Sequence, residues 1–346
     1  MLGIFSKKKE IEVSKKLSRI SHEIEKEVKP ACCILCGKPQ TSFCNSHSVP
    51  QVVLKKITES GEVLNANVLI GIPFVKCNVG LNKTGTFHYI CRKCDNEVFK
   101  DYEDEETLAK YPSDKVLAEI ALKNIIQMLS KRNYEQGLAY RGEKQGKIEG
   151  ADILKQIQEL DIRDYVEEVN LCQLIIKNGT KNNFHVICWE KLPYRIPIAS
   201  QSLMALTFDL EGGIINDLFD FSKENKIENL HIAFFPLEKE SIVLAFYFRK
   251  NRKYENLRKE FERISVKSKL EVLNYLNFQF AENYFFYPPM KKMLKKAKLL
   301  RRLSKQLNGV DNLGFVHVWS KNREAKRIRT DQIPNFLEMS IEDFQK

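Results

Sequence analysis

The chain has 346 residues, of which 43% are hydrophobic and 29% charged, so it has the composition of a globular protein with a sizeable core. Its 15 glycines and 11 prolines are too few for a collagen-like or wholly disordered chain. The formal net charge is +11, and residues 284–346 carry +8 of it, a local excess that favours nucleic acid or an acidic membrane surface as a partner, with a merely basic soluble surface as the alternative. No stretch approaches the roughly 20 apolar residues that span a bilayer. The N-terminal order of apolar residues before lysines is the reverse of a signal peptide, so we expect a cytoplasmic protein without a membrane span.

The N-terminal third divides into a helix and a cysteine-containing segment. A helix is predicted over residues 6–29, because Val13, Leu17, Ile20, Ile24 and Val28 recur at helical spacing. Residues 31–105 have a different character, with paired cysteines, turn-forming glycines and short β-like runs at 68–70 and 87–90. This composition is typical of a small metal-binding module.

The remaining two thirds read as helices followed by an antiparallel meander. Helices are predicted over 113–131 and about 152–169, within a connecting region at 106–170. The predicted strands cover 171–177, 184–190, 204–209, 230–235 and 242–249. The first two strands form a hairpin around Asn178-Gly179, and helices at 252–264 and 268–281 follow. Grouped strands flanked by helices predict an α+β class, with an α+β domain at 171–330 and a tail at 331–346.

Four cysteines in two C-x-x-C pairs, Cys33 with Cys36 and Cys91 with Cys94, carry the clearest chemical signal. Four thiolates suit tetrahedral Zn²⁺, and Gly37 permits a tight turn after the first pair. The second pair leads into a predicted helix. This order of a knuckle, a hairpin and a helix that supplies the last two ligands is that of a treble clef. The 54 residues between the pairs exceed the spacing of compact zinc sites, so two unrelated pairs stay an alternative.

The other cysteines leave some choices open. Cys32 competes with Cys33 for the first ligand position, and Cys44 has ligand-like spacing to His47. Cys172 and Cys188 fall on predicted strands, where we expect small core residues. A thioredoxin-type redox pair is disfavoured because a βαβ setting is missing.

If the four paired cysteines complete a zinc site, His47 is free for acid–base chemistry. The series Cys33-x-x-Cys36-Gly37, Ser46-His47-x-x-Pro50 and Cys91-x-x-Cys94-Asp95-Asn96 resembles the zinc-stabilised HNH endonucleases of the ββα-metal fold. The resemblance covers about residues 30–105. It implies that His47 is the general base, that structural zinc sits on the four cysteines, and that Mg²⁺ or Mn²⁺ assists phosphodiester hydrolysis of nucleic acid, DNA ahead of RNA. The rest of the chain resembles uncharacterised bacterial proteins that carry such a module, and this second resemblance suggests a role in phage defence.

The metal-binding positions of the family are altered in this chain. The position before the catalytic histidine is Ser46, and the position four residues beyond Asp95 is Phe99, which cannot bind a metal. Asp95 is therefore the expected ligand of the catalytic divalent ion. The family's middle asparagine corresponds to Asn65, Asn67, Asn78 or Asn82, and His88 is a substitute ligand or base.

Residues 289–307 contain eight cations and no acid, with apolar residues at helical spacing. The expected helix can lie along phosphates or on an anionic membrane, or it can pack on its domain and leave a solvated basic face. The nucleic-acid-binding candidates are Lys291, Lys292, Lys295, Lys296, Lys298, Arg301 and Arg302. A second basic cluster lies near Trp319, between Lys321 and Arg329.

The sequence thus predicts a zinc-stabilised HNH-like nuclease with His47 and Asp95 in its centre. Two alternatives stay open. The first is a zinc-containing nucleic-acid-binding protein whose HNH-like site has lost its chemistry. The second is a scaffold or sensor that forms a homo-oligomer or binds a partner protein.

Overall fold

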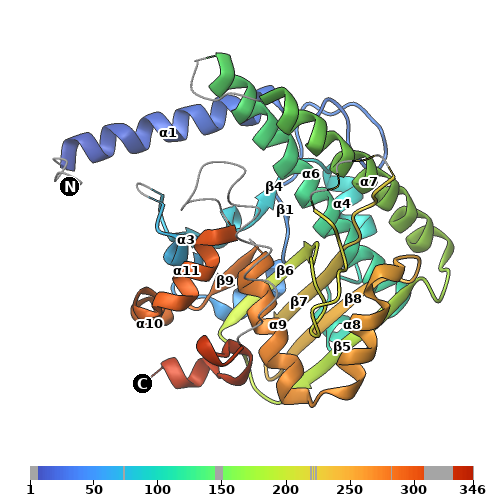
Figure 1. The fold of residues 1–346 in the computed structure, drawn as a ribbon. Helices are drawn as coiled ribbons and strands as arrows, with labels where there is room; N and C mark the ends of the chain where they lie inside the picture. Colours follow the sequence, from blue (N-terminus) through green and yellow to red (C-terminus); the bar gives the residue numbers. More distant parts are fainter. Residues whose placement is uncertain are drawn as a thin grey trace.

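The protein combines long helices with antiparallel β-structure, consistent with the α+β class (Figure 1). The computed structural model describes residues 7–72, 75–144, 151–218, 220, 222, 224–281, 283–307 and 330–345. Its α-helices are α1 (Lys7–Glu27), α2 (Gln51–Leu54), α3 (Asn67–Ile70), α4 (Arg92–Val98), α5 (Glu105–Leu108), α6 (Asp114–Lys144), α7 (Ala151–Asn178), α8 (Glu255–Arg263), α9 (Val266–Phe280), α10 (Lys291–Lys296) and α11 (Lys298–Leu307). Seven short 3-10 helices lie among the described residues, three of them after residue 329.

A sheet of seven strands organises the described chain. Its strands are β2 (Glu62–Asn65), β3 (Asn78–Gly80), β5 (Phe184–Leu192), β6 (Ile198–Met204), β7 (Leu230–Pro236), β8 (Ser241–Phe248) and β9 (Tyr284–Phe286). They follow the order β3-β2-β9-β6-β7-β8-β5, and every pair is antiparallel. The strands β2 and β3 come from the segment between the two cysteine pairs and join the sheet through β9. The cysteine-containing segment and the C-terminal half therefore share one sheet.

Helices cover both faces of this sheet. On one face α6 reaches the sheet, where the Gln201 side chain donates to the carbonyl of Ile120 at 3.4 Å. On the other face the Ser200 hydroxyl donates to Asn277 of α9 at 2.6 Å, and α8 and α9 lie across the strands (Figure 1). Strands covered on both faces are apolar along their whole length, as the fully buried β7 and β8 show.

The N-terminal helix α1 docks on the C-terminal half of α6 and otherwise projects from the body (Figure 1). Ile24 is fully buried at this contact. A Cβ on Gly137 would lie 2.7 Å from Val28, so the small residue permits the close approach of the two helices. Arg141 binds Glu23 and Glu27 at 2.7 and 2.6 Å and fixes the pairing.

Several expected elements are corrected by the structure. Residues 171–177 form the end of helix α7 rather than a strand, because Tyr165, Val169, Cys172 and Ile175 make a buried helical face against α6. The apolar run 68–70 lies in the short helix α3. The expected strand 204–209 is displaced, since β6 ends at Met204.

The expected basic helix over 289–307 is broken into two. Ala297 has φ −74° and ψ 79°, so its backbone leaves the helical region between α10 and α11. Leu294, Leu300 and Leu303 nevertheless remain buried, and both helices pack against α3. The apolar periodicity was therefore correct, but the single continuous helix was wrong.

Candidate functional site

The four paired cysteines meet at one point. The sulfur atoms of Cys33, Cys36, Cys91 and Cys94 all lie within 4.8 Å of one another, and those of Cys36 and Cys91 are 4.0 Å apart. The prediction that the two pairs share a site is confirmed in this respect. Four thiols at this spacing can hold a tetrahedral metal ion such as zinc.

Backbone geometry aims the sulfurs inward. The first pair sits on a turn closed by the Gly37 amide, which donates to the carbonyl of Cys33 at 2.8 Å, and Gly37 has φ +66°. Cys91 caps the N-terminus of α4, and its sulfur accepts from the amide of Cys94 at 3.5 Å. Burial opposes ionisation of Cys33, but amide hydrogen bonds, among them one from Cys91 at 3.3 Å, lower its pKa to about 7. These donors favour the thiolate form that binds metal.

Neither alternative ligand takes part. Cys32 is exposed and lies outside the cluster, so Cys33 is the cysteine of this pair of neighbours that joins the other three sulfurs. The Cys44 thiol donates to the carbonyl of Ile90 at 3.1 Å, and burial together with the charge of Asp95 raises its pKa to about 12. The cysteines expected in the core are buried, Cys172 in α7 and Cys188 in β5.

His47 lies close to the cysteine cluster but is not part of it. The two-stranded sheet of β1 (Ser46–His47) and β4 (Thr86–Phe87) pairs His47 with Thr86, and α4 follows shortly after β4. The Nε2 atom of His47 is 3.1 Å from the carbonyl oxygen of Leu81, which accepts a hydrogen bond from it. Burial and the charge of Lys123 lower the pKa of His47, while the Leu81 carbonyl and Asp95 oppose the shift. The ring is therefore neutral at pH 7, and its Nδ1 atom carries the basic lone pair.

The most unexpected feature of the site is a fully buried lysine. The side chain of Lys123, in the middle of α6, is 0% exposed, and its Nζ atom lies 2.7 Å from Oδ1 of Asp95. The same ammonium donates to the hydroxyl of Ser46 at 2.7 Å, and that hydroxyl donates to Oδ1 of Asp95 at 2.7 Å. Burial alone would raise the pKa of Asp95, but the attraction and hydrogen bond of Lys123 lower it below its ordinary value.

Phe99 completes the surroundings of this ammonium. The centroid of its fully buried ring is 4.1 Å from the Nζ atom of Lys123, a cation–π contact. The positions at which the resemblance expected metal ligands, Ser46, Asp95 and Phe99, thus all contact one lysine. Sequence reasoning missed Lys123, although a cation within the otherwise apolar face of a helix was a usable signal.

The remaining expected site residues have other contacts. Asn65 and Asn67 hold the chain between α3 and β3, through hydrogen bonds to the carbonyls of Lys76 and Val75. Asn78 accepts from Lys291 at 2.7 Å, and Asn82 accepts from Gln51 at 3.4 Å. The backbone of Leu81 therefore orients His47, and because any residue type supplies such a carbonyl, no sequence signal marked it. His88 is exposed and pairs with Asn45 at 2.8 Å.

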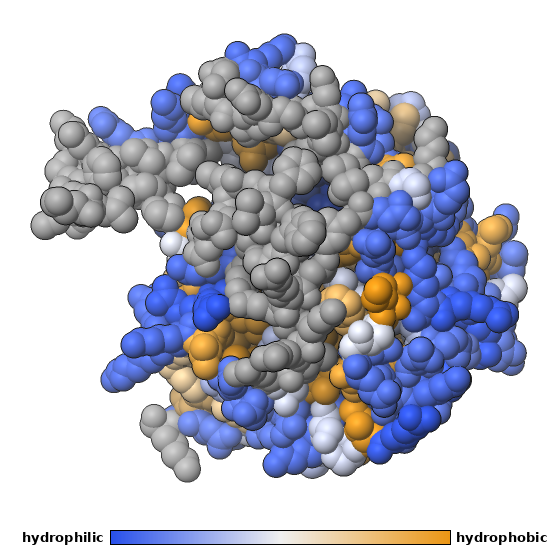
Figure 2. Space-filling model, in the orientation of Figure 1, coloured by the Kyte–Doolittle hydropathy of each residue, from blue (hydrophilic) through white to orange (hydrophobic). Residues whose placement is uncertain are grey.

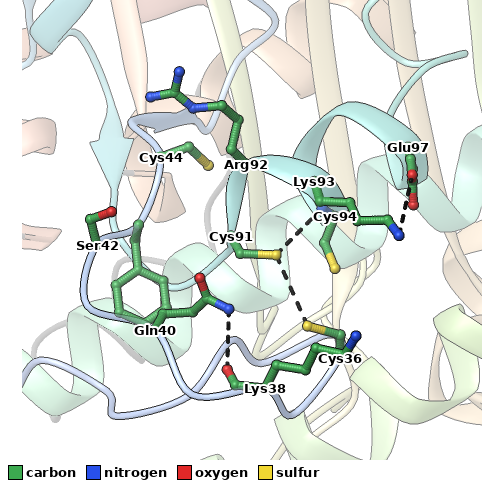
Figure 3. A pocket seen from close by; sticks show the side chains of 11 residues that line it. Cys36, Lys38, Gln40, Ser42, Cys44, Cys91, Arg92, Lys93, Cys94 and Glu97 are labelled. Atoms are coloured by element: carbon green, nitrogen blue, oxygen red, sulfur yellow. Dashed lines mark hydrogen bonds and ion pairs between the residues drawn. The ribbon is translucent and has the colours of Figure 1, made fainter.

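An open groove of about 450 Å³ runs beside the cysteine cluster (Figure 3). Cys91, the N-cap residue of α4, and Cys94 in its first turn line the groove, and Gln40, Ser42 and Phe43 come from the chain after the first knuckle. Lys38, Arg92 and Lys93 add three cations, whereas Glu97 is its one acidic lining residue. The metal site is thus reached from solvent through a polar, basic recess.

The basic residues of α10 and α11 form a second cationic surface. Lys292, Lys295, Lys296, Lys298 and Arg302 are exposed. Lys291 is engaged by Asn78, and Arg301 donates to the carbonyl of Leu69 at 3.3 Å, so both also tie these helices to the cysteine-containing segment. Among the coloured residues on the face drawn in Figure 2, hydrophilic ones predominate. The predicted cluster near Trp319, Lys321 to Arg329, lies outside the described residues.

Comparison with family models, with curated proteins and with solved structures gave no match for this chain. Within the part of the chain that the structure describes, no helix combines the length and the apolar character needed to cross a bilayer. The site geometry is therefore the basis for the functional argument.

Proposed function

We propose that the protein is a zinc-stabilised nucleic-acid-binding protein in which a buried lysine takes the place of the divalent cation of an HNH-like centre. Zinc on Cys33, Cys36, Cys91 and Cys94 would hold α4 against the first knuckle and so fix the position of Asp95. The four thiols fit this structural role because they complete a tetrahedral coordination sphere without an open position.

The Lys123–Asp95 contact carries this proposal. A carboxylate that already neutralises a buried ammonium at 2.7 Å would have to give up that partner, wholly or in part, to bind Mg²⁺ or Mn²⁺. Ser46 is engaged by the same ammonium, and Phe99 offers only its ring. Among the residues that the structure describes, the cysteine quartet is the one group of three or more His, Cys, Asp or Glu side chains that could hold a metal.

Nucleic acid is the proposed partner because the chain presents two cationic surfaces, the groove beside the cysteine cluster and the helices α10 and α11. The exposed cations of α10 and α11 face solvent without an acid in the segment 289–307. Because both helices pack against α3, this basic surface is fixed to the cysteine-containing segment. Lysines and arginines on rigid helices bind phosphates by electrostatic attraction, so the affinity falls as the salt concentration rises.

A second candidate function is hydrolysis of the phosphodiester backbone, and His47 favours it. Its imidazole is neutral, oriented by Leu81 and not used as a zinc ligand, so Nδ1 can accept a proton from attacking water. In this nuclease Asp95 would help hold Mg²⁺ or Mn²⁺ through its second carboxylate oxygen. A role in phage defence rests on the sequence resemblance alone.

The two functions separate in one assay. Purified protein is incubated with labelled single-stranded and duplex DNA and RNA, with Mg²⁺, Mn²⁺ or EDTA, and both binding and cleavage are measured. We expect salt-sensitive binding and intact nucleic acid under every condition. Cleavage that His47→Ala abolishes and that His88→Ala, an exposed histidine control, leaves intact would establish the nuclease instead. If no nucleic acid is bound, both functions are wrong.

A further inference from the structure

We infer that the groove beside the cysteine cluster is a binding site for an unpaired nucleotide of a single strand. This inference rests on the proposed function, nucleic-acid binding, and assigns it a substrate class. The groove has a volume of about 450 Å³, within the roughly 300–1000 Å³ typical of ligand sites. Neither Lys123 nor Asp95 lines it, and the ammonium of Lys123 is closed to solvent.

The charges around the groove favour binding of one nucleotide over binding of several successive backbone phosphates. Lys93 lies 3.9 Å from Glu97, so these two charges largely offset each other. Lys38 and Arg92 are exposed and form no ion pair with any residue in the described ranges. A zinc ion with four thiolates would carry net negative charge, and in Figure 3 the guanidinium of Arg92 points away from the labelled sulfur atoms of the cluster. One phosphate near Arg92 is then favourable, while a dense row of phosphates over the sulfurs is not.

The uncharged groups of the groove suit a nucleobase. Phe43 is half-buried and presents an aromatic ring, with the ammonium of Lys29 located 5.5 Å from its centroid. Gln40 uses its amide nitrogen for a 3.4 Å contact to the carbonyl of Lys38, which leaves its side-chain oxygen as an acceptor, and Ser42 adds an exposed hydroxyl. An aromatic ring with nearby hydrogen-bonding groups is the usual platform for a base.

The recessed ring selects for single strands. In a duplex both faces of each base are stacked on their neighbours, so an aromatic side chain within a groove cannot reach them. An unpaired base has a free face and a flexible backbone, and it can enter the recess with its phosphate directed toward Arg92. We therefore expect the groove to discriminate strand state.

The test uses the full chain loaded with zinc and a fluorescent oligonucleotide, either single-stranded or annealed into a blunt duplex. Anisotropy titrations are run with wild type, Phe43→Leu, Arg92→Gln and the control Lys267→Gln, an exposed cation of α9. Phe43→Leu keeps an apolar side chain at the half-buried position and removes the aromatic face. Zinc content and circular dichroism establish that each variant is folded.

We expect wild type to prefer the single strand, and Phe43→Leu and Arg92→Gln each to weaken its binding by about fivefold or more, with duplex binding and Lys267→Gln little changed. Equal or tighter binding of the duplex by wild type, or undiminished single-strand binding by folded Phe43→Leu and Arg92→Gln, overturns the inference and leaves nucleic-acid binding in place. Binding of neither oligonucleotide overturns the inference together with the proposed function.

Discussion

The Nζ atom of Lys123 and the Oδ1 atom of Asp95 lie 2.7 Å apart, and they join the middle of α6 to the first turn of α4. Because α4 also carries Cys94, this contact links the core helix to the cysteine cluster. The ammonium has no exposed surface, so its charge depends on Asp95, Ser46 and the ring of Phe99. A buried charge that loses its partner is strongly destabilising.

Lys123→Met is expected to lower the free energy of unfolding by roughly 2–4 kcal/mol, because it leaves the Asp95 carboxylate largely buried without its counter-ion. Denaturant unfolding measures the change. The double variant Lys123→Met, Asp95→Asn should be more stable than Lys123→Met alone, since no unpaired charge remains. Lys155→Met in α7 removes an exposed ion pair to Glu159 and should cost less than about 1 kcal/mol. A cost for Lys123→Met as small as this would contradict the interpretation.

We expect zinc binding to depend on Cys33 of the cysteine cluster but not on its neighbour Cys32. Cys33→Ser should lose the bound zinc and destabilise the protein by about 3 kcal/mol or more, because metal binding contributes directly to folding. Cys32→Ser alters the adjacent exposed cysteine and should keep full zinc content. Metal analysis of the purified variants and thermal unfolding with and without chelator give the measurement. Equal zinc loss in both variants would show that the ligand assignment is wrong.

Local patterns predicted the secondary structure unevenly. The four-residue and three-residue apolar spacing of α1 was sufficient, and the strands predicted from the mainly apolar runs of β7 and β8 were correct within one or two residues. The prediction of a strand at 171–177 failed because its leucines and isoleucines are equally compatible with a strand and with the buried face of a long helix. Only packing against α6 decides between them.

Within the candidate site, the sequence predicted the cysteine cluster but not the contacts of His47 and Asp95. The cysteine ligands could be predicted because their spacing within each pair is itself the signal, even with 54 residues between the pairs. Lys123 could not be assigned to Asp95, since 28 residues separate them and the contact depends on how α6 crosses α4. The Leu81 carbonyl that orients His47 is a backbone group and leaves no trace in the sequence.

The basic surface predicts a specific salt dependence. Replacing Lys295 and Lys296 together by glutamine should reduce the slope of log binding constant against log salt by up to about 1.4 for a single strand, if each lysine contacts one phosphate. Both side chains are exposed on α10, so little loss of stability is expected. The control exchanges Lys259 and Lys267, exposed cations of α8 and α9, for glutamine. Equal slopes for the two double variants would exclude α10 from the binding surface.

Glu119 predicts how stability changes with pH. Its side chain is fully buried, and burial raises its pKa to about 7, although the Tyr102 amide donates to Oε2 at 2.8 Å and Lys115 lies 3.8 Å from Oε1. An acid with a raised folded-state pKa binds its proton more tightly in the folded protein, so stability falls as pH rises from about 4.5 to about 7.

Glu119→Gln stays neutral and keeps an acceptor for Tyr102. The free energy of unfolding of this variant should exceed that of wild type by a small amount near pH 5 and by at most about 3 kcal/mol at pH 8. Denaturant unfolding across this range measures the difference, and Glu106→Gln, at an exposed carboxylate of α5, should show no such trend. A gap between Glu119→Gln and wild type that does not change with pH would mean that Glu119 ionises normally in the fold.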